Sequence, residues 1–205
     1  MPWPDVAYPK TIVLRDGAQL TVRRLAAGDE DALLTFFQAI PEAERFFLKD
    51  DVTSADLIRG WVRDAERPDP EPSPTARTAG RAFALVAVAV DDGRILAEAA
   101  LVRRRGAARS HLADLRIVVA QDHRHRGLGT ALLSELLDVA RDSELNGVLF
   151  EAVEESQAQA LAAADALGFI RLGRIYGGAI DPDGRLHDVV LLAMPLRRWR
   201  SAADF

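Results

Sequence analysis

The stretch LRIVVAQDHRHRGLGTALL, residues 115–133, decides the fold. It runs from an apolar, β-branched segment that ends at Val119, through the loop RHRGLGT at residues 124–130, into an amphipathic helix. A strand, a glycine turn and a helix in this order are typical of phosphate sites. Glycines let consecutive N–H groups converge on an anion at the positive end of the helix. Since Arg124 and Arg126 add positive charge, the stretch predicts a phosphate-binding loop.

Two familiar phosphate loops do not fit this stretch. A Walker loop needs Lys followed by Ser or Thr after its last glycine, whereas Gly129 is followed by Thr130 and Ala131. A dinucleotide fingerprint needs a third glycine where Leu132 stands, and an acidic residue closing the next strand. A nucleotide- or dinucleotide-binding protein nevertheless stays open as an alternative.

Downstream of the loop, helices and strands alternate. Apolar residues at helical spacing predict a helix from Leu128 to about Asn146, where Asn146-Gly147 supplies a left-handed stop. A second helix is expected over Ala160–Leu167, after a capping box of Ser156 with Gln159. The strands expected in this half are Val148–Val153, Phe169–Tyr176 and His187–Met194.

Upstream of the loop, β-rich runs and turn signals predict antiparallel strands. Asp16-Gly17 joins the first two runs as in a hairpin. Helical spacing predicts helices over Asp29–Ile40 and Ser54–Val62 with an irregular link between them, and places Phe36, Phe37 and Trp61 in the core. The strands expected in this half are Thr11–Leu14, Gln19–Arg23, Ala82–Val90, Ile95–Arg103 and His111–Val119.

These elements predict a single α/β (α+β) domain with a mixed, mostly antiparallel sheet flanked by helices. The domain is expected over residues 11–196, between an N-terminal tail at 1–10 and a C-terminal tail at 197–205. Residues 65–80 are expected to form a flexible surface loop, because they are rich in proline and poor in apolar residues.

Composition excludes several classes of protein. The formal charge of −5 over 205 residues has the wrong sign for a protein that binds nucleic acid with its whole surface. The chain has no cysteine, and its four histidines lack the spacing of zinc ligands, so we expect no metal site and no cysteine nucleophile. No apolar run approaches the roughly 18 residues of a membrane span. We therefore expect a cytoplasmic protein that binds no membrane.

On two landmarks the sequence resembles the GNAT superfamily of N-acyltransferases. The first is the signature (Arg or Gln)-x-x-Gly-x-(Gly or Ala), here Arg124, Gly127 and Gly129. The second is Leu167-Gly168-Phe169 at the end of a short helix. The resemblance covers roughly residues 11–196. Within the superfamily, the sequence is similar to a bacterial subgroup that contains protein-lysine acetylases and members of unknown substrate. The similarity to this subgroup includes the segments Leu14-Arg15-Asp16-Gly17 and Thr21-Val22-Arg23.

The resemblance implies an acetyl-CoA site. The pantetheine arm would pair with the main chain of Ile117, Val118 and Val119. Gln157 stands where the family often has an asparagine that bonds the pantetheine, and Ala164 stands where many members have a tyrosine that reprotonates the thiolate. Tyr176 is a possible substitute acid. The residues implied to hold the pyrophosphate are Arg124, His125, Arg126, Gly127, Leu128, Gly129 and Thr130.

Asp114 is the candidate catalytic residue. An alkyl amine with a pKa near ~10 is almost fully protonated at neutral pH, so attack on a thioester needs a base or a water chain. Asp114 is the acidic residue of its predicted strand, and the related subgroup carries a carboxylate base at the matching place. Alternatively, Asp114 forms an ion pair with Arg116 on the same face of the strand. Arg103-Arg104-Arg105 is expected to be a solvated loop.

The predicted function is therefore an N-acetyltransferase. It would move the acetyl group of acetyl-CoA to a primary amine, of a small molecule or a protein lysine, by direct transfer in a ternary complex. Backbone N–H groups near Val119 would hold the developing oxyanion. The alternative is a non-catalytic acyl-CoA-binding regulatory module, which the absence of the usual tyrosine permits. A homodimer is possible.

Overall fold

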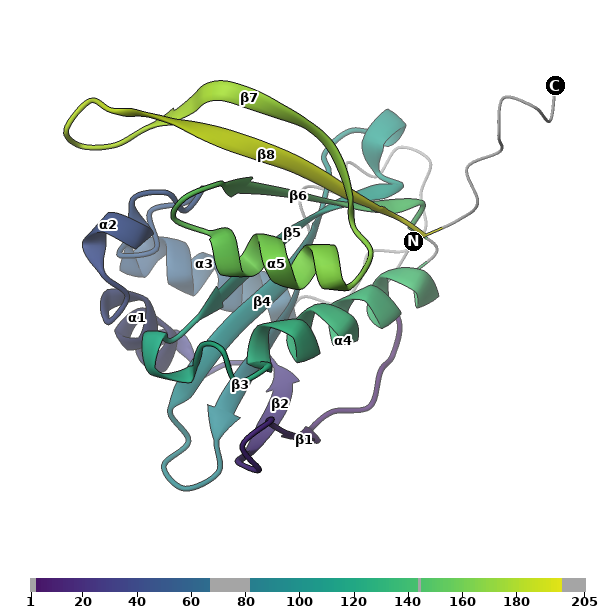
Figure 1. The fold of residues 1–205 in the computed structure, drawn as a ribbon. Coiled ribbons are helices and arrows are strands. Elements are labelled where there is room, and N and C mark those ends of the chain that lie inside the picture. The colour runs from purple at the N-terminus through teal and green to yellow at the C-terminus, as the bar shows by residue number, and fades with distance from the viewer. Residues whose placement is uncertain (1–2, 67–81, 144, 197–205) are drawn as a thin grey trace, which may run out of the picture.

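An eight-stranded sheet forms the centre of the protein. The structure, a computed structural model, describes residues 3–66, 82–143 and 145–196. Neighbouring strands are antiparallel except β5 with β6, in the order β1-β2-β3-β4-β5-β6-β8-β7 (Figure 1). The strands are β1 (Lys10–Val13), β2 (Gln19–Arg24), β3 (Ala82–Ala89), β4 (Ile95–Arg103), β5 (Leu112–Val119), β6 (Gly147–Val153), β7 (Ile170–Ile180) and β8 (Leu186–Pro195). The helices are α1 (Glu30–Gln38), α2 (Glu42–Arg45), α3 (Ala55–Glu66), α4 (Leu128–Asp142) and α5 (Ala158–Ala166).

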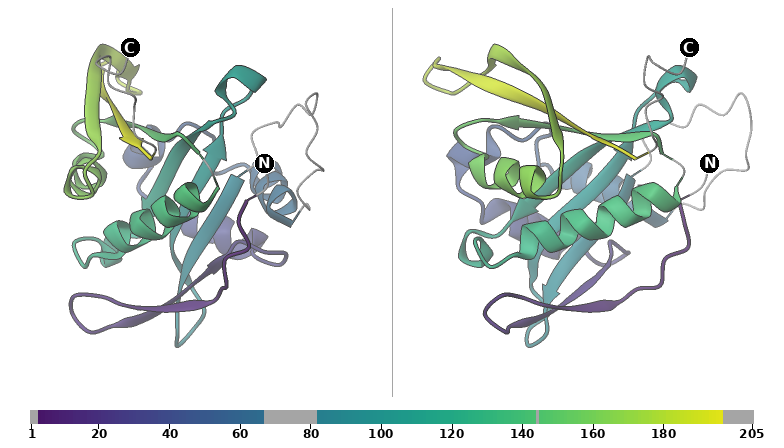
Figure 2. Two further views of the ribbon diagram at one scale, coloured as in Figure 1. Left: turned by 90° about the vertical axis from the view of Figure 1, so that its right-hand side faces the viewer. Right: turned by 45° about the vertical axis from the view of Figure 1, so that its right-hand side comes forward.

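Two apolar cores cover the two faces of the sheet. On β4, Ala99 and Leu101 belong to the core beneath α4 and α5, whereas Ala100 belongs to the core beneath α1 and α3. Because successive side chains of a strand point to opposite faces, a strand covered on both sides is mostly apolar, and β4 is so apart from Glu98 and the terminal Arg103. Helices therefore lie on both faces of the sheet (Figure 2).

β5 and β6 diverge after a short parallel contact. Their register joins Leu112 with Gly147, Ala113 with Val148 and Asp114 with Leu149, and ends there. β5 continues along β4 to Val119, while β6 continues along β8 to Val153. Among the described residues, the edge of β5 beyond Asp114 therefore has no strand partner on the β6 side, and the two strands separate at this place.

The predicted fold class is confirmed. The sheet is mixed and mostly antiparallel, helices flank it, and β5–α4–β6 is the expected crossover. The Asp16-Gly17 turn joins β1 and β2 as predicted, with Gly17 at a positive φ of 85°.

Three local predictions were wrong. The link after α1, expected to be irregular, contains the short helix α2. α4 ends at Asp142 instead of Asn146, and Gly147 lies in β6. The position favours glycine, since an added Cβ would lie 3.3 Å from the carbonyl oxygen of Met194, closer than ordinary packing. The capping box is absent, because Gln157 is the N-cap of α5 and no side chain caps that helix.

The segment before β1 packs against the sheet. The rings of Trp3 and Tyr8 lie 5.8 and 6.3 Å from the ring of Phe83, measured between centroids. Of the expected flexible loop, residues 65 and 66 belong to α3. The rest of that loop, at 67–80, and the expected tail at 197–205 lie outside the described residues.

Candidate functional site

The glycine loop enters α4 through two residues with positive φ. His125 has a φ of 61°, and Gly127, the N-cap of α4, has a φ of 91°. No side chain in the described part of the protein caps the N-terminus of α4, so the N–H groups of its first turn have no partner within the helix or from a described cap. These groups carry the positive end of the helix dipole, which favours an anion at this point.

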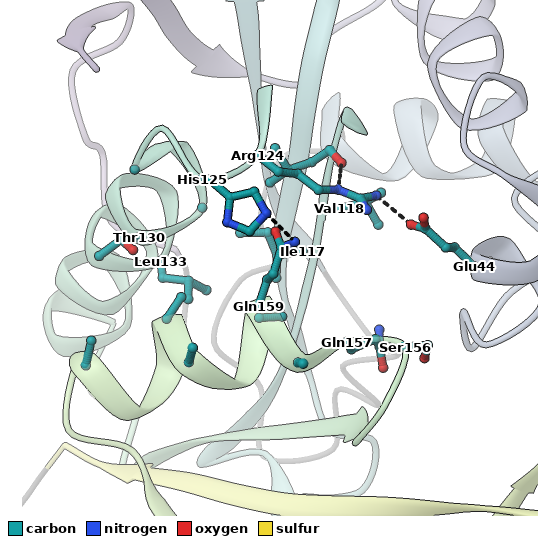
Figure 3. Close-up of a pocket in the computed structure, with 18 of the residues that line it drawn as sticks. Glu44, Ile117, Val118, Arg124, His125, Thr130, Leu133, Ser156, Gln157 and Gln159 are labelled. Carbon is teal, nitrogen blue, oxygen red and sulfur yellow. Dashed lines mark hydrogen bonds and ion pairs between the residues drawn. The ribbon is translucent and has the colours of Figure 1, made fainter. Parts of the chain in front are cut away.

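A cavity of about 570 Å³ lies between this loop, the end of β5 and α5 (Figure 3). We call it the α5 cavity. It brings together nine of the eleven residues that the sequence predicted to bind the cosubstrate. Leu128 is instead buried in the core, and Arg126 lies outside the lining. The nine lining residues are Ile117, Val118, Val119, Arg124, His125, Gly127, Gly129, Thr130 and Gln157.

Arg124 joins the end of β5 to α2. Its Nε donates to the carbonyl oxygen of Val119 at 3.1 Å, and its Nη2 donates to Glu44 Oε2 at 2.6 Å (Figure 3). Glu44 lies on a helix that sequence reasoning missed, and it places a carboxylate in the wall of the cavity. An anion that approaches Arg124 therefore competes with Glu44.

Arg126 fixes the loop from the outside. Its Nε donates to Asp16, and its carbonyl oxygen accepts from the N–H of Arg15 at 3.2 Å. The hydrogen bond from Arg126 holds the pKa of the Asp16 carboxyl below its usual value. These contacts tie the loop to the β1–β2 turn.

Two glutamines position α5 beside the loop. Gln159 Nε2 lies 2.7 Å from His125 Nε2, which joins α5 to the loop across the α5 cavity (Figure 3). Gln157 Oε1 accepts from the N–H of Val153 at 2.8 Å, and Gln157 thereby links the start of α5 to the end of β6.

A second cavity, of about 410 Å³, lies between the segment 47–52, β5, β6 and β7. We call it the β7 cavity. Leu48, Ile117 and Gln157 line both cavities. The two cavities therefore meet where β5 and β6 diverge.

Three residues that line the β7 cavity, Lys49, Asp114 and Glu151, belong to a chain of ion pairs that runs through Arg104, which lies outside the lining. Arg104 Nε lies 2.9 and 3.1 Å from the two carboxylate oxygens of Asp114, and Arg104 Nη2 lies 3.5 Å from Glu151 Oε1. Lys49 Nζ lies 2.9 Å from Glu151 Oε2. Arg104 was expected in a solvated loop and is instead the partner of Asp114. The sequence indicated neither Glu151 nor Lys49, because β6 and the segment after α2 carried no motif.

Arg116 is not the partner of Asp114, and that alternative is wrong. Arg116 donates to Glu98 at 2.8 and 3.1 Å, and its guanidinium carbon lies 3.5 Å from the centroid of the Trp61 ring. Glu98 is fully buried, and the guanidinium group of Arg116 compensates its negative charge. Asp50 approaches Arg116 Nη1 at 3.6 Å.

Both tyrosines lie outside the lining of the two cavities. Tyr176, the substitute acid suggested by the sequence, is 82% exposed on β7. Tyr8 is hydrogen-bonded to Glu135, and burial raises its pKa. Ala164, at the position of the family's usual tyrosine, is fully buried.

The described residues contain no group of three or more histidine, cysteine, aspartate or glutamate side chains that is arranged to hold a metal ion. None of the helices within 3–66, 82–143 and 145–196 combines the length and the apolar character that a membrane span requires.

Comparison with known proteins gives one family model and many similar folds. The model described as "Acetyltransferase (GNAT) family" matches residues 43–169. No curated protein gives a significant sequence match.

Three of the similar solved structures illustrate the shared fold. A GNAT-family acetyltransferase from Streptococcus pneumoniae superposes with a TM-score of 0.70 at 20% identity, over 86% of this chain and 99% of that one. The GNAT domain of S. lividans PAT gives 0.66 at 21% identity, over 91% and 96%. The structure of yncA from Salmonella typhimurium, which contains acetyl-CoA, gives 0.68 at 18% identity, over 89% and 96%.

Proposed function

Because the chain belongs to the GNAT family of acetyltransferases, we propose that it transfers the acetyl group of acetyl-CoA directly to a primary amine in a ternary complex. One observation carries the proposal: two cavities along β5, which share Leu48, Ile117 and Gln157 in their linings, meet where β5 and β6 diverge. A donor in one cavity and an acceptor in the other would bring thioester and amine together at that junction.

The α5 cavity is the proposed acetyl-CoA site. The uncapped N-terminus of α4 and the loop at 124–130 would receive the pyrophosphate, with Arg124 supplying positive charge. The pantetheine arm would extend along Ile117–Val119, where the edge of β5 has no strand partner on the β6 side. An N–H group of that edge would also hold the oxyanion that forms on the thioester carbonyl.

The β7 cavity is the proposed acceptor site. An ammonium group that enters it meets the carboxylates of Asp114 and Glu151, which share Arg104 as a partner. Both oxygens of Asp114 are bound by Arg104, whereas one oxygen of Glu151 is bound by the exposed Lys49. We propose that Glu151 accepts the amine proton and that Asp114, the candidate from the sequence, positions Glu151 through Arg104.

Acetyl-CoA consumption, measured against a broad panel of amines and candidate proteins, tests the proposal. Binding is measured separately by calorimetry with CoA and acetyl-CoA. Turnover of a primary amine, with the acetyl group found on nitrogen by mass spectrometry, is the expected result. Tight binding without turnover of any amine would contradict transfer and favour a non-catalytic acyl-CoA-binding module.

A further inference from the structure

The chain contains two lysines, Lys10 and Lys49, and one of them lies in the proposed acceptor site. Lys49 lines the β7 cavity, next to Leu48, which lines both cavities. Lys10 lies on β1 with its Nζ 2.6 Å from Glu135 of α4, and it lines neither cavity. The two lysines therefore differ in position: Lys49 lies in the proposed acceptor site, and Lys10 lies outside both cavities.

Lys49 presents its amine as an external acceptor would. Its Nζ lies 2.9 Å from Glu151 Oε2, on the part of β6 that follows the last contact with β5. The Lys49 side chain is 53% exposed and the Glu151 side chain is 33% exposed, so neither is fixed by burial. A flexible four-carbon stem allows the ammonium to move while the backbone stays in place.

We propose that Lys49 is acetylated by its own active site, within the same molecule. The proposal rests on the acetyltransferase function proposed above. An amine attached to the wall of the site reacts as if it were present at a millimolar concentration or more. Acetylation of Lys49 therefore needs no added acceptor.

The reaction balances without a further reactant. The ammonium of Lys49 gives one proton to Glu151, and the neutral nitrogen attacks the carbonyl carbon of the acetyl thioester. The C–N bond forms and the C–S bond breaks, so CoA leaves as a thiolate. The thiolate takes one proton from solvent, and the proton lost by nitrogen as the amide forms passes to solvent. The products are Nε-acetyl-Lys49 and CoA.

The experiment incubates the full chain with isotopically labelled acetyl-CoA and no added amine, and follows the label by peptide mass spectrometry. Three variants accompany the parent chain. Lys49→Arg removes the proposed target, Lys10→Arg removes the other lysine, and Gly129→Glu places a charge in the α5 cavity. The labelling rate is measured at several protein concentrations, because a reaction within one molecule has a rate that does not depend on concentration, whereas a reaction between molecules becomes faster as the concentration rises.

We expect label on Lys49 at a rate roughly tenfold or more above that on Lys10, independent of protein concentration. The label should persist at Lys49 in Lys10→Arg and be lost there in Gly129→Glu. Equal labelling of both lysines, or unchanged labelling of Lys49 in Gly129→Glu, would identify uncatalysed acetylation and overturn the proposal.

Two further outcomes separate this proposal from the proposed function. A chain that acetylates an external amine and leaves Lys49 unlabelled overturns self-acetylation alone. A chain that fails to bind acetyl-CoA in calorimetry overturns both.

Discussion

Asp114 is bound by Arg104 in a fork, with Arg104 Nη2 at 2.8 Å and Nε at 2.9 Å from the same carboxylate oxygen. Arg104 also approaches Glu151, so two carboxylates at the β7 cavity share one cation. Asp114 would have to exchange this partner in order to accept an amine proton. Glu151 needs only to replace the exposed Lys49 by the acceptor amine.

Glu151→Gln should lower turnover of the external amine by roughly 10²-fold or more and leave acetyl-CoA affinity nearly unchanged. The amide keeps the shape of the side chain but does not accept the amine proton, and losing a general base has about this effect. Steady-state kinetics across pH and calorimetry on the same sample measure the two quantities. A rate within a few-fold of the parent would assign proton removal to another group or to solvent.

Asp114→Asn should have the smaller effect on rate, a loss of a few-fold. It weakens a part-exposed ion pair with Arg104, so the free energy of unfolding should fall by about 1 kcal/mol or less. Chemical denaturation and the pH profile of turnover are the measurements. A loss of about 10²-fold with unchanged stability would return the role of base to Asp114, as the sequence predicted.

Gly129→Glu should abolish CoA binding, whereas Gly129→Ala should leave the fold intact. An added Cβ at Gly129 would lie 3.8 Å from the side chains of Ile117 and Val119, which is an ordinary packing distance. A carboxylate at the same place repels a diphosphate from the N-terminus of α4. Calorimetry with CoA and thermal melting compare the two variants. Unchanged CoA affinity in a folded Gly129→Glu chain would contradict the assignment of the α5 cavity.

Arg124→Ala and Glu44→Gln should change CoA affinity in opposite directions. Arg124→Ala removes a charge-assisted contact and should weaken CoA by roughly ten- to a hundredfold. Glu44→Gln removes the carboxylate that competes for Arg124, so it should strengthen CoA binding, most clearly at low salt. Titration calorimetry at two salt concentrations measures the CoA affinity of both variants and of the parent chain. Weaker binding in both variants would show that the pair acts only by holding α2 in place.

Much of the fold was predictable because its signals are local. The Asp16-Gly17 turn, the alternation of helix and strand after residue 120, and the glycine loop each lie within a short segment. α2 escaped prediction because it has four residues, none of them buried, and therefore no apolar periodicity. The role of Glu44 in the wall of the α5 cavity was not predicted for the same reason, because Glu44 lies on α2.

The ion pairs of the site were less predictable because register decides them. Asp114 and Arg116 share a face of β5, as the sequence indicated, but each binds a residue diagonally across from it. Val102 lies opposite Asp114, and Arg104 is two residues beyond it. Ala100 lies opposite Arg116, and Glu98 is two residues before it. Diagonal neighbours of this kind follow from strand register, which a single sequence does not provide.

His187 contacts two carboxylates near the tip of the β7–β8 hairpin. Its Nε2 lies 3.1 Å from Asp181, and its Nδ1 lies 2.6 Å from Glu155. The hydrogen bond with Asp181, and then that with Glu155, raises the pKa of His187 above its ordinary value of 6.5. The same bond with His187 holds the pKa of Asp181 below its ordinary value of 3.8.

Amide protection at the hairpin tip should therefore be highest between about pH 4 and 6.5. The contribution of His187 is complete below its ordinary pKa and is lost as pH rises through the raised value. The contribution of Asp181 is lost only as pH falls through its lowered value. Hydrogen-exchange protection factors at Asp181 and Gly184, whose N–H groups bond across the turn, measure this. The pH dependence above 6.5 should vanish in His187→Gln and persist in the control His111→Gln, and its survival in His187→Gln would contradict the assignment.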